Sequence, residues 1–350
     1  MRPDWRALLT EAGAVVDEGR VLRFADPLQE LRTAMQGDIV CDLSQQGVIA
    51  AQGPDTQAFL QGQVTCDVRE VTPEHSQLGA YCTPKGRMLA IFRLFQYGDN
   101  YYLCMPRERV APILKRLRLF VLRAKTTLED ASDTLVQIGL AGPNAETLLQ
   151  QILGAAPSKT DQVTQTQGMT VIRVPGTRPR FELFGEVDDT KKVWTALAAK
   201  AIPVGADPWR LLDILAGVPS VSAETAETFV PQMANLQLLN GVSFQKGCYT
   251  GQEIVARTRY LGKLKRRMYL ARVHSTTLPR PGEELFSPQA DASQSAGRIV
   301  AACRHPEGGF AALAVVLIDC AEGAGVLLGD AHGAPLEFMP LPYSFETPAA

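Results

Sequence analysis

A weak internal repeat limits the folds open to this 350-residue chain more than any other feature. Two stretches, Val48–Gln61 and Gln137–Gln150, share an apolar run, a Gly-Pro pair and a second apolar-patterned segment. Each predicts a strand, a turn and a helix whose first position is the proline, Pro54 or Pro143. The repeat therefore predicts a fold in which one kind of unit is built twice.

A β-hairpin and a second helix are predicted after each copy. Strands over 87–96 and 101–105 flank a Gly-Asp-Asn turn in the first copy, and strands over 171–174 and 180–184 flank a Pro-Gly turn in the second. A helical apolar stripe follows each hairpin, formed by Val110, Ile113, Leu114, Leu117 and Val121 in one copy and by Val193, Leu197 and Ala198 in the other. The unit strand-helix-hairpin-helix thus predicts an α+β fold of two similar layers packed side by side. Polar residues 158–168 are expected to form a surface loop.

The pattern changes beyond Gly262 to short β segments separated by Gly and Pro. The clearest segments are 268–273, 297–302 and 311–318. Helical periodicity is missing there, which favours a small β-barrel. These patterns predict four parts. They are an N-terminal extension (1–36), a first α+β lobe (37–130), a second α+β lobe that carries the motif described below (131–262), and a C-terminal barrel (263–345). Exchange of segments between the two lobes is left open.

Composition indicates a globular protein, with 46% hydrophobic and 21% charged residues. A net charge of -2 gives no general attraction to nucleic acid, so a polyanion site requires a local basic patch, for which 107–125 and 257–272 qualify. No apolar run reaches the ~18 residues that a membrane span requires. The first twenty residues contain four carboxylates and no apolar core of signal length. The expected partners therefore exclude a membrane, and the expected location is the cytoplasm.

Cysteine and histidine spacing argues against a metal site. The seven cysteines lack the CxxC pattern of zinc and redox sites, and the four histidines show no ligand spacing. Six cysteines lie in apolar sequence, as core residues in a reducing compartment do.

The seventh, Cys248, lies in a different setting. Thr250 and Glu253 have the spacing of a capping box, which predicts a helix starting at Gly251. A helix N-terminus just after Cys248 and the cation of Lys246 both favour a thiolate. The alternative is that Cys248 is a small core residue, as most free cysteines are.

The segment Lys246-Gly247-Cys248-Tyr249-Thr250-Gly251-Gln252-Glu253 resembles the signature of the YgfZ family, folate-binding proteins of iron-sulfur cluster assembly that are distant relatives of the glycine cleavage T-protein. Arg257 continues the resemblance. Phe59–Val68 is similar to the family's Q-G-Q-V-T-x-D-V box, and Lys85-Gly86 to its K-G turn. The resemblance covers roughly residues 38 to 345 and leaves 1–36 without a counterpart.

This resemblance implies a three-lobed T-protein-like body that binds tetrahydrofolate or a derivative. Trp209 matches a folate-associated tryptophan of the family, while Gln46 replaces a second one. On its sequence alone Trp209 could equally be a core anchor. The implied role is assembly or repair of iron-sulfur enzymes such as radical tRNA-modifying enzymes, with Cys248 as reactive thiolate and Lys246 stabilising it. Whether Cys248 acts as nucleophile, ligand or redox group stays open.

Two alternatives come from other classes of protein. A folate-dependent one-carbon transferase is disfavoured, because T-proteins carry carboxylates where this chain has residues 86–92, a segment without a carboxylate, and Leu215. This chain is therefore not expected to be an aminomethyltransferase or a classical enzyme. An RNA-binding protein would use the basic side chains of Arg257, Arg259, Lys263, Lys265, Arg266 and Arg267, which could also simply be solvated.

Overall fold

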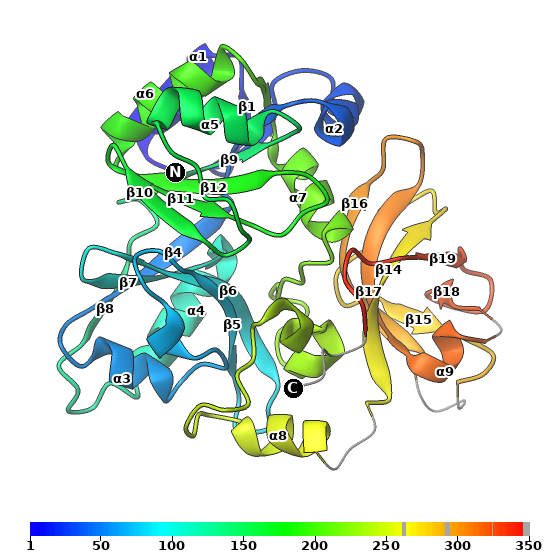
Figure 1. The fold of residues 1–350 in the computed structure, drawn as a ribbon. Helices are drawn as coiled ribbons and strands as arrows, with labels where there is room; N and C mark the ends of the chain where they lie inside the picture. Colours follow the sequence, from blue (N-terminus) through cyan, green and yellow to red (C-terminus); the bar gives the residue numbers. More distant parts are fainter. Residues whose placement is uncertain (261–263, 291–294, 324, 346–350) are drawn as a thin grey trace. The chain divides into compact units, whose positions relative to one another are not determined.

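The computed structural model describes residues 1–260, 264–290, 295–323 and 325–345 (Figure 1). The fold is a mixed α/β fold, and the chain forms two compact units from interleaved stretches. Unit 1 comprises Met1–Phe59, Val68–Gln77 and Arg93–Leu212, and unit 2 comprises Leu60–Asp67, Leu78–Phe92 and the chain from Asp213. The domain boundaries proposed from sequence at residues 36, 130 and 262 stay a prediction.

Unit 1 contains a six-stranded sheet in the order β10-β11-β12-β9-β3-β13. Its strands are β3 (Ile39–Asp42), β9 (Val136–Ala141), β10 (Val163–Thr166), β11 (Met169–Arg173), β12 (Arg180–Gly185) and β13 (Ile202–Val204). Neighbours run antiparallel except for β13 and β3, which are parallel. Three amphipathic helices bury their apolar stripes on one face: α1 (Pro3–Glu11), α5 (Ala145–Leu153) and α6 (Val187–Ala198).

The N-terminal residues are part of this core. After α1 the chain forms β1 (Val15–Asp17), β2 (Arg20–Arg23) and α2 (Pro27–Gln36). Trp5 packs edge-to-face on Trp194 with ring centroids 5.6 Å apart. Trp5 Nε1 donates to Asp42 Oδ1 at 2.7 Å, and burial raises the pKa of Asp42 to about 6. Residues 1–36 therefore fold as part of unit 1.

A second sheet has the order β5-β6-β7-β4-β8. Its strands are β4 (Gln46–Gln52), β5 (Gln77–Cys82), β6 (Met88–Tyr97), β7 (Asn100–Pro106) and β8 (Thr127–Asp130). Strand β6 starts in unit 2 and continues into unit 1 at Arg93. α3 (Thr56–Gln61) and η1 (Val68–Glu70) follow β4, and α4 (Arg107–Arg118) follows β7.

Both predicted hairpins are present, as β6 with β7 and β11 with β12. The second strand of each hairpin pairs antiparallel with the strand that opens its copy, β7 with β4 and β12 with β9. The same element order therefore gives the same strand pairing in both sheets.

Two local expectations were wrong. Helices α3 and α5 begin two residues after the prolines, since the carbonyls of Asp55 and Asn144 accept the first helical hydrogen bonds. Each proline thus lies in the turn, after a glycine with φ of 120° or 142°.

The second wrong expectation concerns residues 158–168, which were predicted to form a surface loop. They contain strand β10, because Val163 is buried and the polar residues after it pair with β11 at the sheet edge.

Unit 2 ends in a curled antiparallel sheet, a half-barrel with the order β18-β15-β16-β17-β14-β19 (Figure 1). Its elements are β14 (Arg266–Val273), β15 (Glu284–Phe286), β16 (Gly297–Arg304), β17 (Phe310–Leu317), α9 (Ile318–Ala321), β18 (Leu327–Leu328) and β19 (Leu336–Met339). Alternate side chains of these strands form an apolar core. The three segments predicted from sequence correspond to β14, β16 and β17.

The remaining elements follow β13 along the chain. α7 (Ala206–Leu215) runs from unit 1 into unit 2, followed by η2 (Pro231–Ala234), η3 (Leu236–Leu239) and α8 (Gln252–Tyr260). Within the described ranges, every helix is too short or too polar to cross a lipid bilayer.

Candidate functional site

The signature residues 246–253 form a loop of unit 2 that leads into α8. All seven cysteines are in the described part of the chain; six are buried and Cys248 is exposed. The neighbouring Gly247 is also exposed, and a Cβ added there would meet no atom within 4 Å. The Cys248 thiol therefore lies at an open surface, which rules out the alternative that it is a core residue.

Lys246 lies beneath this surface with only 5% of its area exposed. Its Nζ donates to the carbonyl oxygens of Val64 at 2.7 Å and Cys66 at 2.6 Å, and it lies 5.2 Å from the ring centroid of Tyr249. Hydrogen bonds from a buried ammonium are strong and costly to lose. Lys246 therefore fixes the loop to residues 64–66, and its predicted effect on the thiolate stays a prediction.

Thr65 links its own segment to the stretch of chain just before the signature and to strand β5. Its hydroxyl donates to Gly241 O at 2.6 Å, and its carbonyl accepts from Ser243 N at 2.9 Å. Its hydroxyl also accepts from Ala80 N at 2.8 Å, on strand β5. The Q-G-Q-V-T box and the signature, about 180 residues apart in sequence, thus form one structure within unit 2.

Tyr249, the residue after Cys248, is buried. Burial raises the pKa of its hydroxyl above the usual value, and the nearby thiols of Cys82 and Cys66 add to this effect. Burial also raises the pKa of Cys82 to about 12. Cys82 is therefore protonated at neutral pH and unreactive, in contrast to the exposed Cys248.

The helix start differs from the prediction by one residue. Gly251 has a φ of +85° and its carbonyl accepts the first helical bond, from Val255 N, so the helix begins at Gln252. Glu253 is consequently the second helical residue, and Thr250 precedes the cap instead of forming the predicted capping box. Gly251 also lies close to the backbone of the β5–β6 turn, because a Cβ on Gly251 would lie 2.5 Å from Thr83 O.

The other motif residues surround this turn. Gly86, in the Lys-Gly turn, has a φ of +70°, and its Cα would lie 3.0 Å from a Cβ on Gly251. Gln252 is half-buried, whereas Glu253 and Arg257 are exposed on α8. Two glycines in contact therefore let the β5–β6 turn support the start of α8.

Trp209 lies in unit 1, on α7, with 2% of its area exposed. A Cβ added at Gly139 would lie 2.5 Å from the ring, and the Arg180 guanidinium carbon is 4.4 Å from the ring centroid. The indole is thus enclosed by strands β9 and β12 and belongs to a core cluster. Its predicted contact with folate stays a prediction, and stacking of a pterin on this ring requires Arg180 to move.

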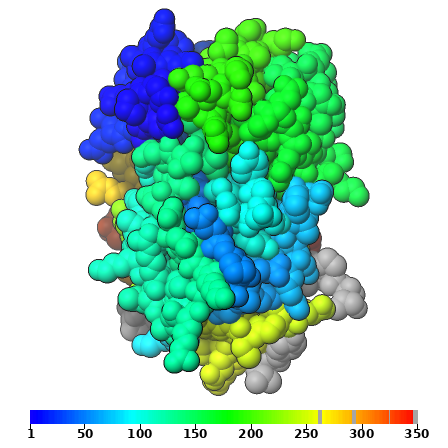
Figure 2. All heavy atoms as spheres, turned by 90° about the vertical axis from the view of Figure 1, so that its left-hand side faces the viewer, coloured from blue at the N-terminus to red at the C-terminus, as the bar shows by residue number. Residues whose placement is uncertain are grey.

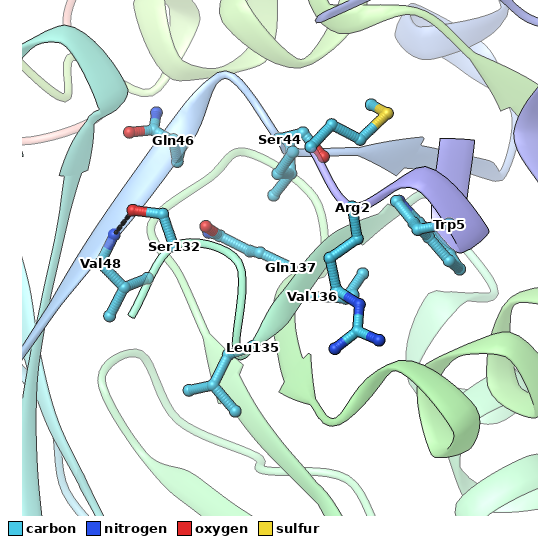
Figure 3. A pocket seen from close by; sticks show the side chains of 11 residues that line it. Arg2, Trp5, Ser44, Gln46, Val48, Ser132, Leu135, Val136 and Gln137 are labelled. Atoms are coloured by element: carbon cyan, nitrogen blue, oxygen red, sulfur yellow. Dashed lines mark hydrogen bonds between the residues drawn. The ribbon is translucent and has the colours of Figure 1, made fainter. Parts of the chain in front are cut away.

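Gln46 lines a small pocket of unit 1 together with Trp5, Ser44 and Gln137 (Figure 3). The cavity measures about 20 Å³, the room of about one water molecule. Gln137 is buried, and its Nε2 has no hydrogen-bond partner among the described residues. A water would satisfy that group, but a pterin ring does not fit the cavity as it stands. The folate contact predicted for Gln46 stays a prediction.

No cluster of three or more potential metal ligands occurs among the residues that the structure describes. The supporting groups that the sequence did not reveal are the carbonyls of Val64 and Cys66, which carry no side-chain signal. Thr65 and Gly86 stood in recognised motifs, yet nothing in sequence linked either one to the signature.

The exposure of Cys248 gives a direct expectation for thiol chemistry. Competitive labelling with iodoacetamide over a range of pH, read by mass spectrometry, is expected to modify Cys248 first, because the other six thiols react only when the chain opens. Faster modification of Cys41, Cys66 or Cys303 would contradict the assignment.

Comparison with known proteins agrees with these features. Residues 18–246 match the family model of the GCVT N-terminal domain. The chain is 33% identical to the tRNA-modifying protein YgfZ of Yersinia pestis (strain Pestoides F) over 297 residues, covering 85% of this chain and 90% of the relative. It is 39% identical to YgfZ of Colwellia psychrerythraea over 230 residues, covering 65% of this chain and 69% of the relative.

A solved structure shows the fold relationship. The glycine cleavage system aminomethyltransferase T of Bartonella henselae superposes with a TM-score of 0.77 over 96% of both chains, at 18% identity. Identity this low supports the fold alone. The family model, the extent of the two relatives and the signature loop agree, and the chain belongs to the YgfZ family, whose fold is related to that of the T-protein.

Proposed function

We propose that this protein supports tRNA modification as a folate-binding accessory protein for the assembly or repair of iron-sulfur enzymes, acting through Cys248. The observation that carries the proposal is the contrast among the thiols: six are buried, and Cys248 stands exposed on a loop fixed from below by Lys246. The name of the curated relatives, tRNA-modifying protein, supports the link to tRNA.

The loop suits a thiol that meets a large partner. Gly247 leaves the approach to Cys248 open, while Lys246 and Thr65 hold the backbone in place. A preorganised, accessible thiol can act as a nucleophile, as a transient ligand of a cluster or persulfide, or as a redox group. In each case the clients would be iron-sulfur proteins such as radical tRNA-modifying enzymes.

Tetrahydrofolate or a derivative is the proposed cofactor, on the ground that the matched domain is of the T-protein type. We place it next to Trp209, where the Arg180 side chain would have to move off the indole ring to admit the pterin. The chain's own contribution would be an aromatic surface for the flat pterin and a guanidinium able to pair with an anionic group. The two similar sheets would be duplicated layers of a three-lobed, T-protein-like body, with the half-barrel as the third lobe.

The rival proposal is a folate-dependent one-carbon transferase. Residues 88–92 of β6 are apolar and buried, so this strand offers no carboxylate for proton transfer. Turnover of an aminomethyl donor by the purified protein would favour this rival. None of the seven cysteines, all of which the structure describes, forms a disulfide bond, and this suits a cytoplasmic protein, where we place it.

Tryptophan fluorescence tests the folate site. Addition of tetrahydrofolate is expected to quench emission, and Trp209→Phe is expected to remove most of the quench while the protein stays folded. Trp194→Phe is the matched control, because Trp194 is equally buried but packs on Trp5 and Phe24 instead. A full quench in Trp209→Phe, or its loss in Trp194→Phe, would move the folate site elsewhere.

A further inference from the structure

Unit 1 carries a concentration of positive charge on and after helix α4. Residues 107–125 contain seven cations and one carboxylate, a net charge of +6, whereas the whole chain has a net charge of -2. The rest of the molecule is therefore acidic, and this stretch is the local exception. A basic patch on an acidic protein indicates a specific polyanionic partner.

The cations that can meet a partner are Lys115, Arg118, Arg123 and Lys125, which are exposed. Lys115, Arg123 and Lys125 form no ion pair with any described residue. Two other cations of the stretch are unavailable, because Arg107 pairs with Asp133 at 2.9 Å and Arg109 is buried. The end of α4 and the segment after it thus hold four accessible positive charges.

Three large apolar side chains lie among these charges. Leu119 is 68% exposed, Phe120 45% and Leu122 87%. The helix buries its own apolar stripe at Val110, Ile113, Leu114 and Leu117, so these three residues are not part of the core. Figure 2 shows this turquoise part of the chain forming a broad area of the surface that faces the viewer. We name residues 115–125 the α4-end patch.

The patch has a fixed shape. Arg118 donates from Nε at 3.0 Å and from Nη2 at 2.6 Å to Leu128 O, and Lys125 N donates to Asp55 Oδ2 at 2.7 Å. Between these anchors Leu122 has a φ of 45°, a conformation that costs energy in any residue with a side chain. The backbone thus holds a strained turn that presents apolar groups to solvent, which points to binding and not to core packing.

We propose that the α4-end patch binds structured RNA at an unpaired nucleotide. Phe120 would stack on the unpaired base, with Leu119 and Leu122 as the apolar surround, and the four cations would contact the flanking phosphates. Proteins recognise RNA loops in this way, since unstacked bases bind aromatic side chains and the backbone binds Lys and Arg. The surface lies entirely in unit 1 and its function does not depend on Cys248.

Other occupants fit the patch less well. A second copy of the chain would bring two like-charged surfaces together in a symmetric contact. On a bilayer the four cations would carry most of the binding, because three apolar side chains are fewer than the apolar face of a membrane-surface helix.

The basic run on and after α8, the other RNA-binding candidate, has more of its cations engaged in contacts within the protein. Arg259 stacks on Phe244, Arg267 stacks on Phe345, and Arg266 donates to Ser295 O. Arg257 and Lys265 are exposed, and Lys263 lies outside the described residues.

The test is binding of an unmodified tRNA transcript to the full chain, measured by fluorescence anisotropy at several salt concentrations. Four phosphate contacts predict a log-log salt slope of about -3, equal to a roughly 60-fold loss of affinity between 50 and 200 mM salt. Arg123→Glu and Lys125→Glu are each expected to make the slope shallower by about 1, from about -3 to about -2. Phe120→Ala is expected to weaken binding about tenfold at every salt concentration without changing the slope.

Matched controls lie on unit 2, where Arg304→Glu changes an exposed cation and Leu278→Ala an exposed apolar side chain. Both are expected to bind tRNA like the parent protein. Equal binding by the parent and the patch variants would overturn the proposal. Patch-dependent cosedimentation with phosphatidylglycerol vesicles without tRNA binding would assign the patch to a membrane surface. Loss of tRNA modification in cells with unchanged tRNA binding would assign it to a protein partner.

Discussion

Cys248→Ala is expected to abolish function in the cell while leaving the protein folded and soluble. The thiol is exposed and its removal leaves no cavity, whereas the loop that carries it is fixed by Lys246 and Thr65. The measurement is the amount of methylthiolated nucleoside in tRNA from cells that lack the native protein and carry the variant, under oxidative stress. We expect the level of the deletion strain.

Two further variants separate chemistry from structure. Cys248→Ser keeps the size and polarity of the side chain but not the thiolate, so it should fail as Cys248→Ala does. Cys303→Ala removes a buried thiol from the half-barrel and should retain function with a modest loss of stability. Full complementation by Cys248→Ala would show that the thiol is dispensable, leaving the folate site or the α4-end patch to carry the function.

Local sequence patterns predicted the elements whose partners are close in the chain. The hairpins β6–β7 and β11–β12 followed from alternating apolar residues around turn residues, and α4 from its helical stripe. Strands β3 and β13 are short, and their paired residues are 163 positions apart in the sequence, so no local pattern predicted them. Their stability comes from tertiary contacts that composition does not encode.

The candidate site, too, was predictable from sequence only where its features are local. The motif singled out Cys248 among the seven cysteines, but it did not predict the hydrogen bonds that hold the Cys248 loop in place. Lys246 binds backbone carbonyls about 180 residues upstream, and any residue type offers a carbonyl. The predicted capping box missed the helix start because the close approach of Gly86 to Gly251 is a tertiary constraint that outweighs a local spacing rule.

That glycine contact carries the second large expected effect. Gly251→Ala is expected to lower the free energy of unfolding by roughly 3 kcal/mol or more. The φ of +85° disfavours any residue with a Cβ, and the added Cβ would lie 2.5 Å from Thr83 O and 3.0 Å from the Cα of Gly86. Both neighbours are backbone atoms, so relief requires the β5–β6 turn and the start of α8 to separate.

Gly247→Ala is the matched control within the same signature, because a Cβ there meets no atom within 4 Å. Urea denaturation should place its stability within about 0.5 kcal/mol of the parent, as for other surface substitutions. Gly251→Ala should unfold at a clearly lower urea concentration. Iodoacetamide should also label its buried cysteines such as Cys82, which displacement of the β5–β6 turn would expose. If both variants unfold with the parent's midpoint, the glycine contact does not hold the loop, and the rigid presentation of Cys248 must come from Lys246 and Thr65 alone.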